Sequence, residues 1–386
     1  MADGNLAQTS LIERAKAVAA IASAHADESE KLGQLANPVV AALHENELFG
    51  MWVPKSVGGA ELDPTDSLQV IENLAWGDPS TGWVLMAAAL AVGTGAAYLD
   101  KSAVDELFGG ERYPVIAGQG TRPGTAVPHE DGFLLSGSWS FASGIRHGTH
   151  IHTLGLVSTT GEPRIFVLPV EQAELIDNWD VMGLRATGSI DYKIDSAYVP
   201  ESYTHFAVTD EPKQGGYLYR AGIIGFACMC HSGWACGIGR RLLDELAENV
   251  RTRGGLQNPQ GASDSFQQGY AKAEGTYRAA RALVYETWTD VQDTLKRGAE
   301  LSTRQHSLMR LAMTHVTWAA HEVAAFVYKH SGTNALRASP IQRLFRDMHA
   351  GTQHVVASPP VFGALGRELA GLVDNPRWAF LNLESA

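Results

Sequence analysis

The spacing of hydrophobic residues divides the chain into three regions. From Leu11 to about Arg112, apolar residues recur every three to four positions, which is typical of amphipathic helices. The clearest stripe consists of Leu11, Ala15, Val18, Ala19 and Ala22. We therefore expect a helical N-terminal region.

From about Tyr113 to Phe206 the spacing changes to short apolar runs broken by Gly and Pro, which predicts strands. These runs are Phe133–Leu135, Ile151–Val157, Ile165–Leu168 and Tyr192–Val199. Thr159, Thr160, Gly161 and Glu162 separate two of them and are typical of a hairpin turn. Several short strands in under a hundred residues indicate a small sandwich or barrel.

Helical spacing returns from about Gly215 in longer, Pro-free pieces. Tyr270–Asp290 and Ser302–Lys329 have lengths that suit a four-helix bundle. Ala221–Gly239 is strongly apolar, but it contains five glycines, His231 and Ser232, so we expect a buried helix rather than a membrane span. The chain of 386 residues exceeds what one core usually serves. We therefore predict three domains, at residues 1–112, 113–207 and 208–386.

Composition narrows the class of protein. Hydrophobic residues make up 45% of the chain and charged residues 19%, as in ordered soluble proteins. The formal net charge of -12 and the lack of a basic cluster argue against nucleic acid and membranes as partners. Three clustered cysteines, Cys228, Cys230 and Cys236, favour a reducing compartment. Since Met1–Ser10 has no apolar signal core, we expect a cytoplasmic protein.

Local motifs add a family resemblance. The motifs are Phe49–Pro54 with Gly58 and Gly59, Asp78–Trp83, Gly137–Gly144, Gly183–Ser189, and Arg343 with Arg346 and Asp347. In this order they resemble the acyl-CoA dehydrogenase superfamily over nearly the whole chain. The resemblance implies an α+β fold with an N-terminal helical domain, a small central β-domain and a C-terminal four-helix bundle.

Within the superfamily, the pattern is most similar to two-component flavin-dependent monooxygenases. Examples are the oxygenase components that hydroxylate 3-hydroxy-9,10-seco steroids and 4-hydroxyphenylacetate. The segments that carry this likeness are Ser80–Trp83, Ser143 and Gly144 with His147, and Arg346–Gly351 with His354. The resemblance implies reduced FMN or FAD as cofactor, a small-molecule substrate, a separate NAD(P)H-flavin reductase and a homotetramer.

The motif after the predicted strand supplies candidate flavin contacts. By resemblance, Trp139 and Phe141 would wall the flavin ring, and the Ser143 hydroxyl would hydrogen-bond N5 or the adjacent carbonyl. The alternative is that Trp139 and Phe141 form the inward face of a strand, because side chains two apart share a face.

A second set of candidates would approach the cofactor elsewhere. Thr187, Gly188 and Ser189 offer small side chains and backbone amides for flavin or its phosphate, although the same triplet suits an ordinary turn. Arg251 stands where the family has an arginine near the phosphates. The alternative for Arg251 is a solvated charge at a helix end.

The position of the dehydrogenase base decides against dehydrogenation. Alignment by resemblance puts Val355 where many acyl-CoA dehydrogenases have their catalytic glutamate, with His354 beside it. No Asp or Glu occurs from Met348 to Ala364, and the other base position used in the family, near Leu218–Arg220, is not acidic either. A valine cannot remove a proton from carbon.

His354 suits an oxygenase instead. The resemblance implies that reduced flavin and O₂ form a C4a-hydroperoxide, which Ser143 would support. His354 would take a phenolic proton or hydrogen-bond the substrate, since imidazole titrates in a useful range. The alternative is a capping or buried structural histidine. His147 and His150 follow the same loop, and their roles stay open.

Other functions remain as alternatives. A metal site is disfavoured, because His349 and His354 point to different faces of a helix and the cysteine cluster suits core packing. The segment Val84–Val92 lacks a histidine that phenol hydroxylases of this branch tend to have, and oxygenation at C, N or S stays open. A dehydrogenase-like flavin enzyme with a relocated base and a non-catalytic flavin protein are the competing classes.

Overall fold

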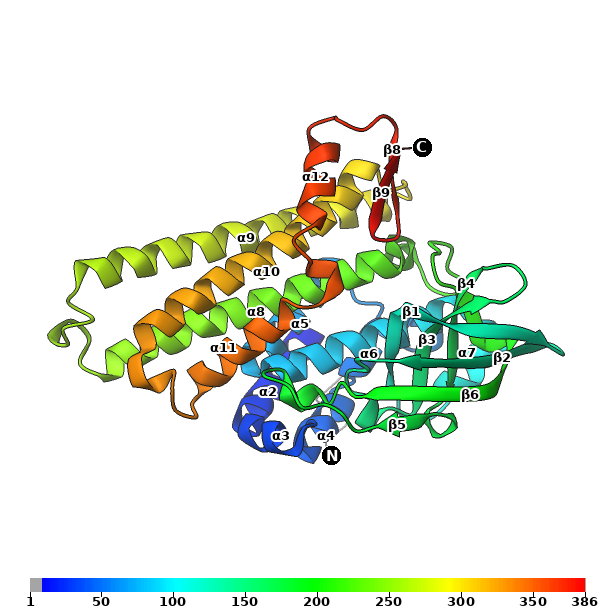
Figure 1. The fold of residues 1–386 in the computed structure, drawn as a ribbon, viewed down its shortest axis with the longest axis horizontal. Helices are drawn as coiled ribbons and strands as arrows, with labels where there is room; N and C mark the ends of the chain where they lie inside the picture. Colours follow the sequence, from blue (N-terminus) through cyan, green and yellow to red (C-terminus); the bar gives the residue numbers. More distant parts are fainter. Residues whose placement is uncertain (1–8, 386) are drawn as a thin grey trace.

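The computed structural model describes residues 9–385, in the order helices, sheet, helices (Figure 1). The predicted stripe is confirmed, because Ala15, Val18, Ala19 and Ala22 form the buried face of the first helix. The N-terminal helices are α2 (Leu11–Ala24), α3 (Ala26–Leu32), α4 (Asn37–Glu45), α5 (Pro64–Gly77), α6 (Pro79–Tyr98) and α7 (Lys101–Phe108).

The central region is one seven-stranded sheet with the order β5-β6-β2-β1-β3-β4-β7. Its strands are β1 (Ile116–His129), β2 (Gly132–Trp139), β3 (His150–Val157), β4 (Pro163–Pro169), β5 (Glu174–Ile176), β6 (Asp191–Pro200) and β7 (Thr204–Phe206). All neighbours are antiparallel except β1 and β3. The predicted hairpin turn lies between β3 and β4, where Gly161 adopts a positive φ of 72°.

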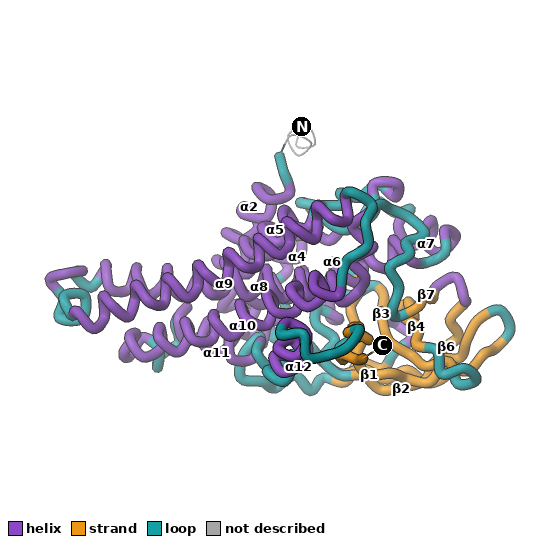
Figure 2. Tube along the Cα trace, turned by 90° about the horizontal axis from the view of Figure 1, so that it is seen from above, coloured by secondary structure: helices purple, strands orange, loops and turns teal. Residues whose placement is uncertain are grey.

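The C-terminal region is a bundle of long helices, which confirms the predicted α+β class. Figure 2 shows α8, α9 and α10 running side by side and extending beyond the sheet. The helices are α8 (Gly222–Thr252), α9 (Asp264–Lys296), α10 (Thr303–Ser331), α11 (Pro340–Gly351) and α12 (Val361–Leu369). The predicted domain boundaries fall between α7 and β1 and between β7 and α8, and the division into three domains stays a prediction.

The chain continues past the bundle into a feature that its sequence did not predict. Two short strands, β8 (Pro376–Ala379) and β9 (Asn382–Ser385), pair as an antiparallel hairpin. The Trp378 indole donates to Ser307 Oγ at 2.8 Å, and the Arg310 guanidinium stacks over the Trp378 ring. The hairpin is therefore fixed to α10.

Two helical segments, Pro79–Tyr98 and Tyr217–Thr252, are long and apolar enough to cross a membrane. In each segment the most apolar window is largely buried inside the protein, at 89% and 78%. The segments contact each other, since Trp234 Nε1 donates to Pro79 O at 2.9 Å and Cys230 Sγ to Met86 O at 3.4 Å. Packing in the core therefore accounts for their apolar character.

A buried polar contact helps to join the sheet region to the bundle. Asp347 on α11 is buried, and its Oδ1 accepts a hydrogen bond from Leu184 N at 2.6 Å. Beside it, a Cβ added to Gly183 would lie 2.1 Å from Arg346 O, so only glycine fits. Two motifs separated by more than 150 residues thus meet in space, which fixes the loop 183–189 against α11.

We predict that Asp347 makes stability depend on pH. Burial raises the pKa of Asp347 to about 7, although the Leu184 N–H opposes this rise. Because the folded state then binds the proton more tightly than the unfolded chain, the free energy of unfolding should fall as pH rises from about 4 to about 7. Asp347→Asn keeps the acceptor and should flatten this part of the profile in thermal or urea unfolding.

Asp347→Ala is the matched comparison, because it leaves the Leu184 N–H without its acceptor. Its expected cost is about 1–3 kcal/mol at every pH. A wild-type profile that is already flat across this range, or an Asp347→Asn profile with the wild-type slope, would contradict the assignment.

Candidate functional site

The loop that follows β2 separates two aromatic residues that the sequence grouped together. Trp139 is 1% exposed, stacks on Tyr192 at 5.3 Å and donates to Leu154 O at 3.1 Å. Phe141 has a positive φ of 69°, which breaks the strand alternation, and its side chain is 67% exposed beside Trp179. The structure therefore corrects the prediction for Trp139, which packs in the β-domain core, while Phe141 faces outward at the site.

Four side chains under this loop form a continuous series of hydrogen bonds, called the hydroxyl line below: Trp83, Ser143, Ser189 and Thr187. Trp83 Nε1 lies 3.1 Å from Ser143 Oγ, and Ser143 Oγ lies 2.8 Å from Ser189 Oγ. Thr187 Oγ1 lies 2.6 Å from Ser189 Oγ and 2.7 Å from Leu184 O. All three hydroxyl residues are buried. The structure thus brings together Ser143, Thr187 and Ser189, which the sequence offered as candidates from two separate motifs.

The direction of these hydrogen bonds is fixed at both ends. An indole N–H can only donate, and a backbone carbonyl can only accept. Thr187 must therefore give its one proton to Leu184 O, Ser189 must donate to Thr187, and Ser143 must donate to Ser189. The Ser143 oxygen keeps one lone pair for a further partner, and that partner has to be a donor.

Backbone contacts hold the two loops at this spacing. Gly144 N donates to Thr187 O at 2.9 Å, and Ala142 N donates to Ile190 O at 3.1 Å. A Cβ on Gly144, whose φ is 79°, would lie 2.9 Å from Val84 Cγ1 on α6. Gly188 also has a positive φ of 51° and approaches Gly33 O. The loops and α6 therefore meet with little freedom to shift.

Trp83 also belongs to an aromatic cluster that contains His354. Its ring is 5.7 Å from the His354 ring, 5.0 Å from His231 and 5.0 Å from Trp234. The His231 and His354 rings are 4.3 Å apart. Ser143 and His354 are thus linked through a single indole. His354 precedes the 3-10 turn η10 (Val355–Ala357), where its Nδ1 lies 3.5 Å from Val356 N.

Both histidines of the cluster are held neutral. Burial lowers the pKa of His354 to about 4. Burial also lowers the pKa of His231 well below its usual range, and the neighbouring His354 adds to that effect. A neutral imidazole carries one donor and one acceptor, so His354 can exchange hydrogen bonds with a substrate at neutral pH.

His231 is a site residue that the sequence did not identify. Its motif suggested core packing among cysteines, and His231 is indeed buried in α8. The available signal was helical spacing, because His231 and Trp234 are three apart and share a face. What makes it part of the site is His354, which is 123 residues away in the sequence and becomes its neighbour only on folding.

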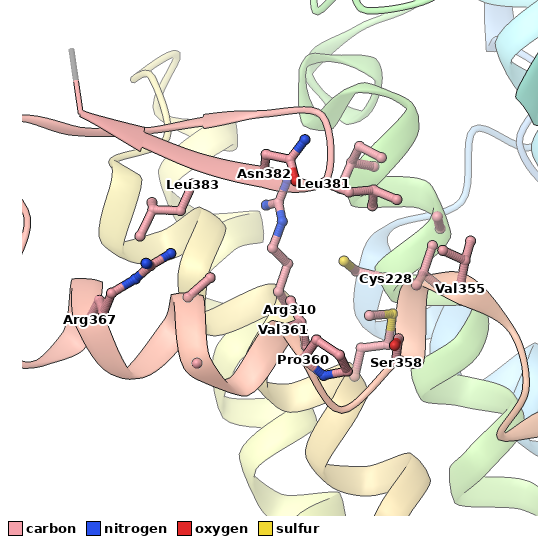
Figure 3. Close-up of a pocket in the computed structure, with 16 residues that line it drawn as sticks. Cys228, Arg310, Val355, Ser358, Pro360, Val361, Arg367, Leu381, Asn382 and Leu383 are labelled. Atoms are coloured by element: carbon pink, nitrogen blue, oxygen red, sulfur yellow. The ribbon is translucent and has the colours of Figure 1, made fainter.

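A cavity of about 630 Å³ is lined in part by Val355 and Val356, the two residues that follow His354 in the sequence (Figure 3 labels Val355). Val355, the residue in the base position, is 49% exposed and lines it together with Val356. None of the residues that line the cavity, within the part of the chain that the structure describes, is acidic. Leu218 and Tyr219, near the other base position, are fully buried. The geometry therefore offers no carboxylate for dehydrogenation.

Arg251 is the predicted site residue that lies apart from the rest. It ends α8, where its exposed guanidinium pairs with Glu248. Twenty residues of helix separate it from His231, a distance of about 30 Å. Within a single chain Arg251 therefore does not reach the hydroxyl line.

The remaining histidines and cysteines do not assemble into a metal site. Within residues 9–385, no three His, Cys, Asp or Glu side chains converge as ligands. His349 contacts His321 and Phe345, away from His354. The three cysteines are free and buried, and burial raises the pKa of all three thiols. His147 and His150 lie just beyond the Ser143 loop, and burial lowers the pKa of both.

The chain is similar in sequence to known flavin-dependent enzymes. Residues 7–102 match the family "Acyl-CoA dehydrogenase, N-terminal domain", and residues 229–359 match "Acyl-CoA dehydrogenase, C-terminal domain". An indole-3-acetate monooxygenase of Pseudomonas putida is 31% identical over 334 residues, which is 85% of each chain. The flavin-dependent monooxygenase oxygenase subunit HsaA of Mycobacterium tuberculosis is 25% identical and covers 86% of this chain and 88% of its own.

Solved structures share the fold. The 3-HSA hydroxylase from Rhodococcus sp. RHA1 superposes with a TM-score of 0.88 at 22% identity, covering 98% of this chain and all of that one. XiaF from Streptomyces sp., in complex with FADH2 and glycerol, gives a TM-score of 0.84 at 23% identity and covers 94% of this chain and 95% of its own.

We predict that His354 stays neutral across the physiological range. In an NMR titration of the chain labelled at histidine rings, the signal that disappears in His354→Ala should not move between about pH 8 and about pH 5.5. Its midpoint should lie near 4. A midpoint near the ordinary value of 6.5 would show that the ring is better solvated than this cluster implies.

Proposed function

The chain belongs to the acyl-CoA dehydrogenase family and, within it, to the flavin-dependent monooxygenases, and from this premise we propose that it hydroxylates an aromatic or polycyclic small molecule. The reaction would convert a substrate C–H, O₂ and reduced flavin into C–OH, water and oxidised flavin. The observation that carries the proposal is the series of contacts from Ser143 through Trp83 to His354, together with the absence of a carboxylate from the cavity that the next residues, Val355 and Val356, line.

The residues around the loop fit a flavin. Phe141 presents an exposed aromatic face, and Ser143, Thr187, Gly188 and Ser189 supply small side chains and hydroxyls at the same place. We propose that these five residues hold the flavin. When bound, reduced flavin supplies two electrons to O₂ and passes one oxygen atom to the substrate.

The direction of the hydroxyl line favours the reduced cofactor. Reduced flavin carries a proton on N5, whereas oxidised flavin has a bare acceptor there. Ser143 Oγ can only accept from a further partner, because its own proton is used by Ser189. Ser143 would therefore hydrogen-bond N5–H of reduced flavin and would have no proton to offer the oxidised form.

His354 would act on the substrate from the other side of Trp83. Its neutral imidazole can take a proton from a substrate hydroxyl or hydrogen-bond the reacting group, and His231 behind it limits how the ring turns. The Trp83 ring, 5.7 Å from the His354 ring, would shield one side of this position from water.

The oligomeric state of the enzyme and the source of its reduced flavin are also part of what we propose. We infer a cytoplasmic homotetramer of three-domain chains that receives reduced FMN or FAD from a separate NAD(P)H-flavin reductase. The relative named as an oxygenase subunit supports the separate reductase. Exposed apolar side chains such as Phe141 and Met182 support burial between subunits. In such an assembly, the exposed Arg251 would serve the flavin phosphates of a neighbouring subunit.

The first test follows oxygen from ¹⁸O₂ into product. The chain would be loaded anaerobically with reduced FMN or FAD, mixed with ¹⁸O₂ and a panel of phenols and indoles, and analysed by mass spectrometry. Products should gain one labelled oxygen atom. His354→Ala should lower hydroxylation by about 10²- to 10⁴-fold and raise the peroxide released per flavin oxidised.

His349→Ala is the control, because His349 lies on the same polypeptide segment but contacts Phe345 and His321 instead. It should leave product and peroxide unchanged. If reduced flavin fails to bind, or if no product carries the labelled oxygen, the proposed function is wrong. If His354→Ala hydroxylates fully without added peroxide, the role proposed for His354 is wrong.

The second test concerns the hydroxyl line. Ser189→Ala removes the acceptor for the Ser143 proton, so Ser143 becomes able to donate to oxidised flavin. The preference for reduced over oxidised FMN, measured as the ratio of the two dissociation constants, should therefore fall by about tenfold.

Ser67→Ala is a matched control. Ser67 also accepts an indole N–H, from Trp52 at 2.7 Å, and donates to a backbone carbonyl, but it lies in the N-terminal core. It should cost stability without changing the ratio. An unchanged ratio in Ser189→Ala would mean that the line does not discriminate between the two redox states.

A further inference from the structure

The cavity lined by Val355 and Val356 contains a buried cation that lacks a counter-ion. Arg310 on α10 is only 4% exposed. Its Nη1 donates to His306 O at 3.0 Å and its Nη2 to Phe380 O at 2.8 Å, while its Nε has no partner. Among residues 9–385, no carboxylate forms an ion pair with Arg310. Glu368, the buried acid that follows Arg367 in the sequence, pairs with Arg304.

An unpaired buried charge is costly, and proteins rarely keep one without a use. The guanidinium of Arg310 stacks on Trp378 at 4.3 Å, which compensates part of the lost hydration. Burial nevertheless lowers the pKa of Arg310, which reflects the cost of keeping the charge there. An anion beside Arg310 would remove that cost.

The rest of the cavity has the composition of a site for an aromatic ligand. Apolar side chains line most of it, including Val355 and Val356 from the turn after His354 and Met313 from α10. Its volume of about 630 Å³ lies in the range of small-molecule sites. Figure 3 shows Arg310 reaching toward Asn382 of the hairpin, Val355 and Cys228 on one side, and Arg367 on the other.

We propose that this cavity binds an aromatic carboxylic acid, with the carboxylate on Arg310 and the ring against Val355, Val356 and Met313. The proposal deepens the proposed function and rests on it, because the turn that holds His354 also forms the cavity wall. A guanidinium matches a carboxylate in two parallel hydrogen bonds, whereas a neutral amide gains only part of that interaction.

Two further observations fit an anionic substrate. The second arginine of the cavity, Arg367 on α12, adds positive charge in a chain whose net charge is -12. A local positive site on an acidic protein selects which anion binds and where. The 31% identical relative is named for indole-3-acetate, an aromatic acid, as its substrate.

The test compares an acid with its uncharged analogue. The full chain, saturated with reduced FMN under anaerobic conditions, would be titrated by calorimetry with indole-3-acetate and with indole-3-acetamide. The acid should bind about 10- to 100-fold more tightly than the amide. Arg310→Gln should bring the two affinities within about twofold of each other.

Two control variants separate charge from structure. Trp378→Leu loosens the hairpin that Arg310 also holds, but it keeps the guanidinium, so it should retain the preference for the acid. Arg377→Gln removes an exposed charge from the same hairpin and should also retain it. If Trp378→Leu lost the preference as completely as Arg310→Gln, Arg310 would be a structural residue only.

The outcomes distinguish this inference from the proposed function. Equal affinity for acid and amide, failure of both to bind, or a preference that survives Arg310→Gln would overturn the carboxylate site while leaving flavin-dependent hydroxylation intact. If reduced FMN itself did not bind, the proposed function would fail, and the acid–amide comparison on the flavin-free chain would still decide the cavity.

Discussion

The hydrogen bond from Leu184 N to the buried Asp347 carboxylate is the contact on which the site depends. It ties the loop 183–189 to α11, and both partners continue directly into functional residues. Along the loop the chain reaches Thr187 and Ser189, and along α11 it reaches His354. Burying a carboxyl group lowers the free energy of unfolding. Its presence here indicates that fixing the position of the loop 183–189 outweighs this loss of stability.

Much of the fold and part of the site could be predicted from the sequence. Helical and strand spacing gave the order of elements, because burying one face of each element leaves a periodic pattern. The motifs around Ser143, Ser189 and His354 identified residues that the fold does bring together. Trp139 and Phe141 were misjudged as a pair, because nothing in their spacing reveals the positive φ of Phe141.

His231 and Arg310 could not be predicted from the sequence, for a different reason. His231 acquires its role from a ring more than a hundred residues away, and Arg310 is distinctive only because no acid stands beside it. Such properties belong to the tertiary arrangement and leave no local pattern. The C-terminal hairpin is similar, since its strands have four residues each and depend on α10 for their place.

The three thiols of α8 make this arrangement open to direct observation. Cys228, Cys230 and Cys236 lie on the same helix as His231, and it is the thiolate form of cysteine that reacts with alkylating reagents. Since burial both shields these sulfurs and raises their pKa, they stay protected for as long as the helix keeps its neighbours. The rate at which these three thiols are alkylated therefore measures how often the helix α8 and its neighbours open by local unfolding.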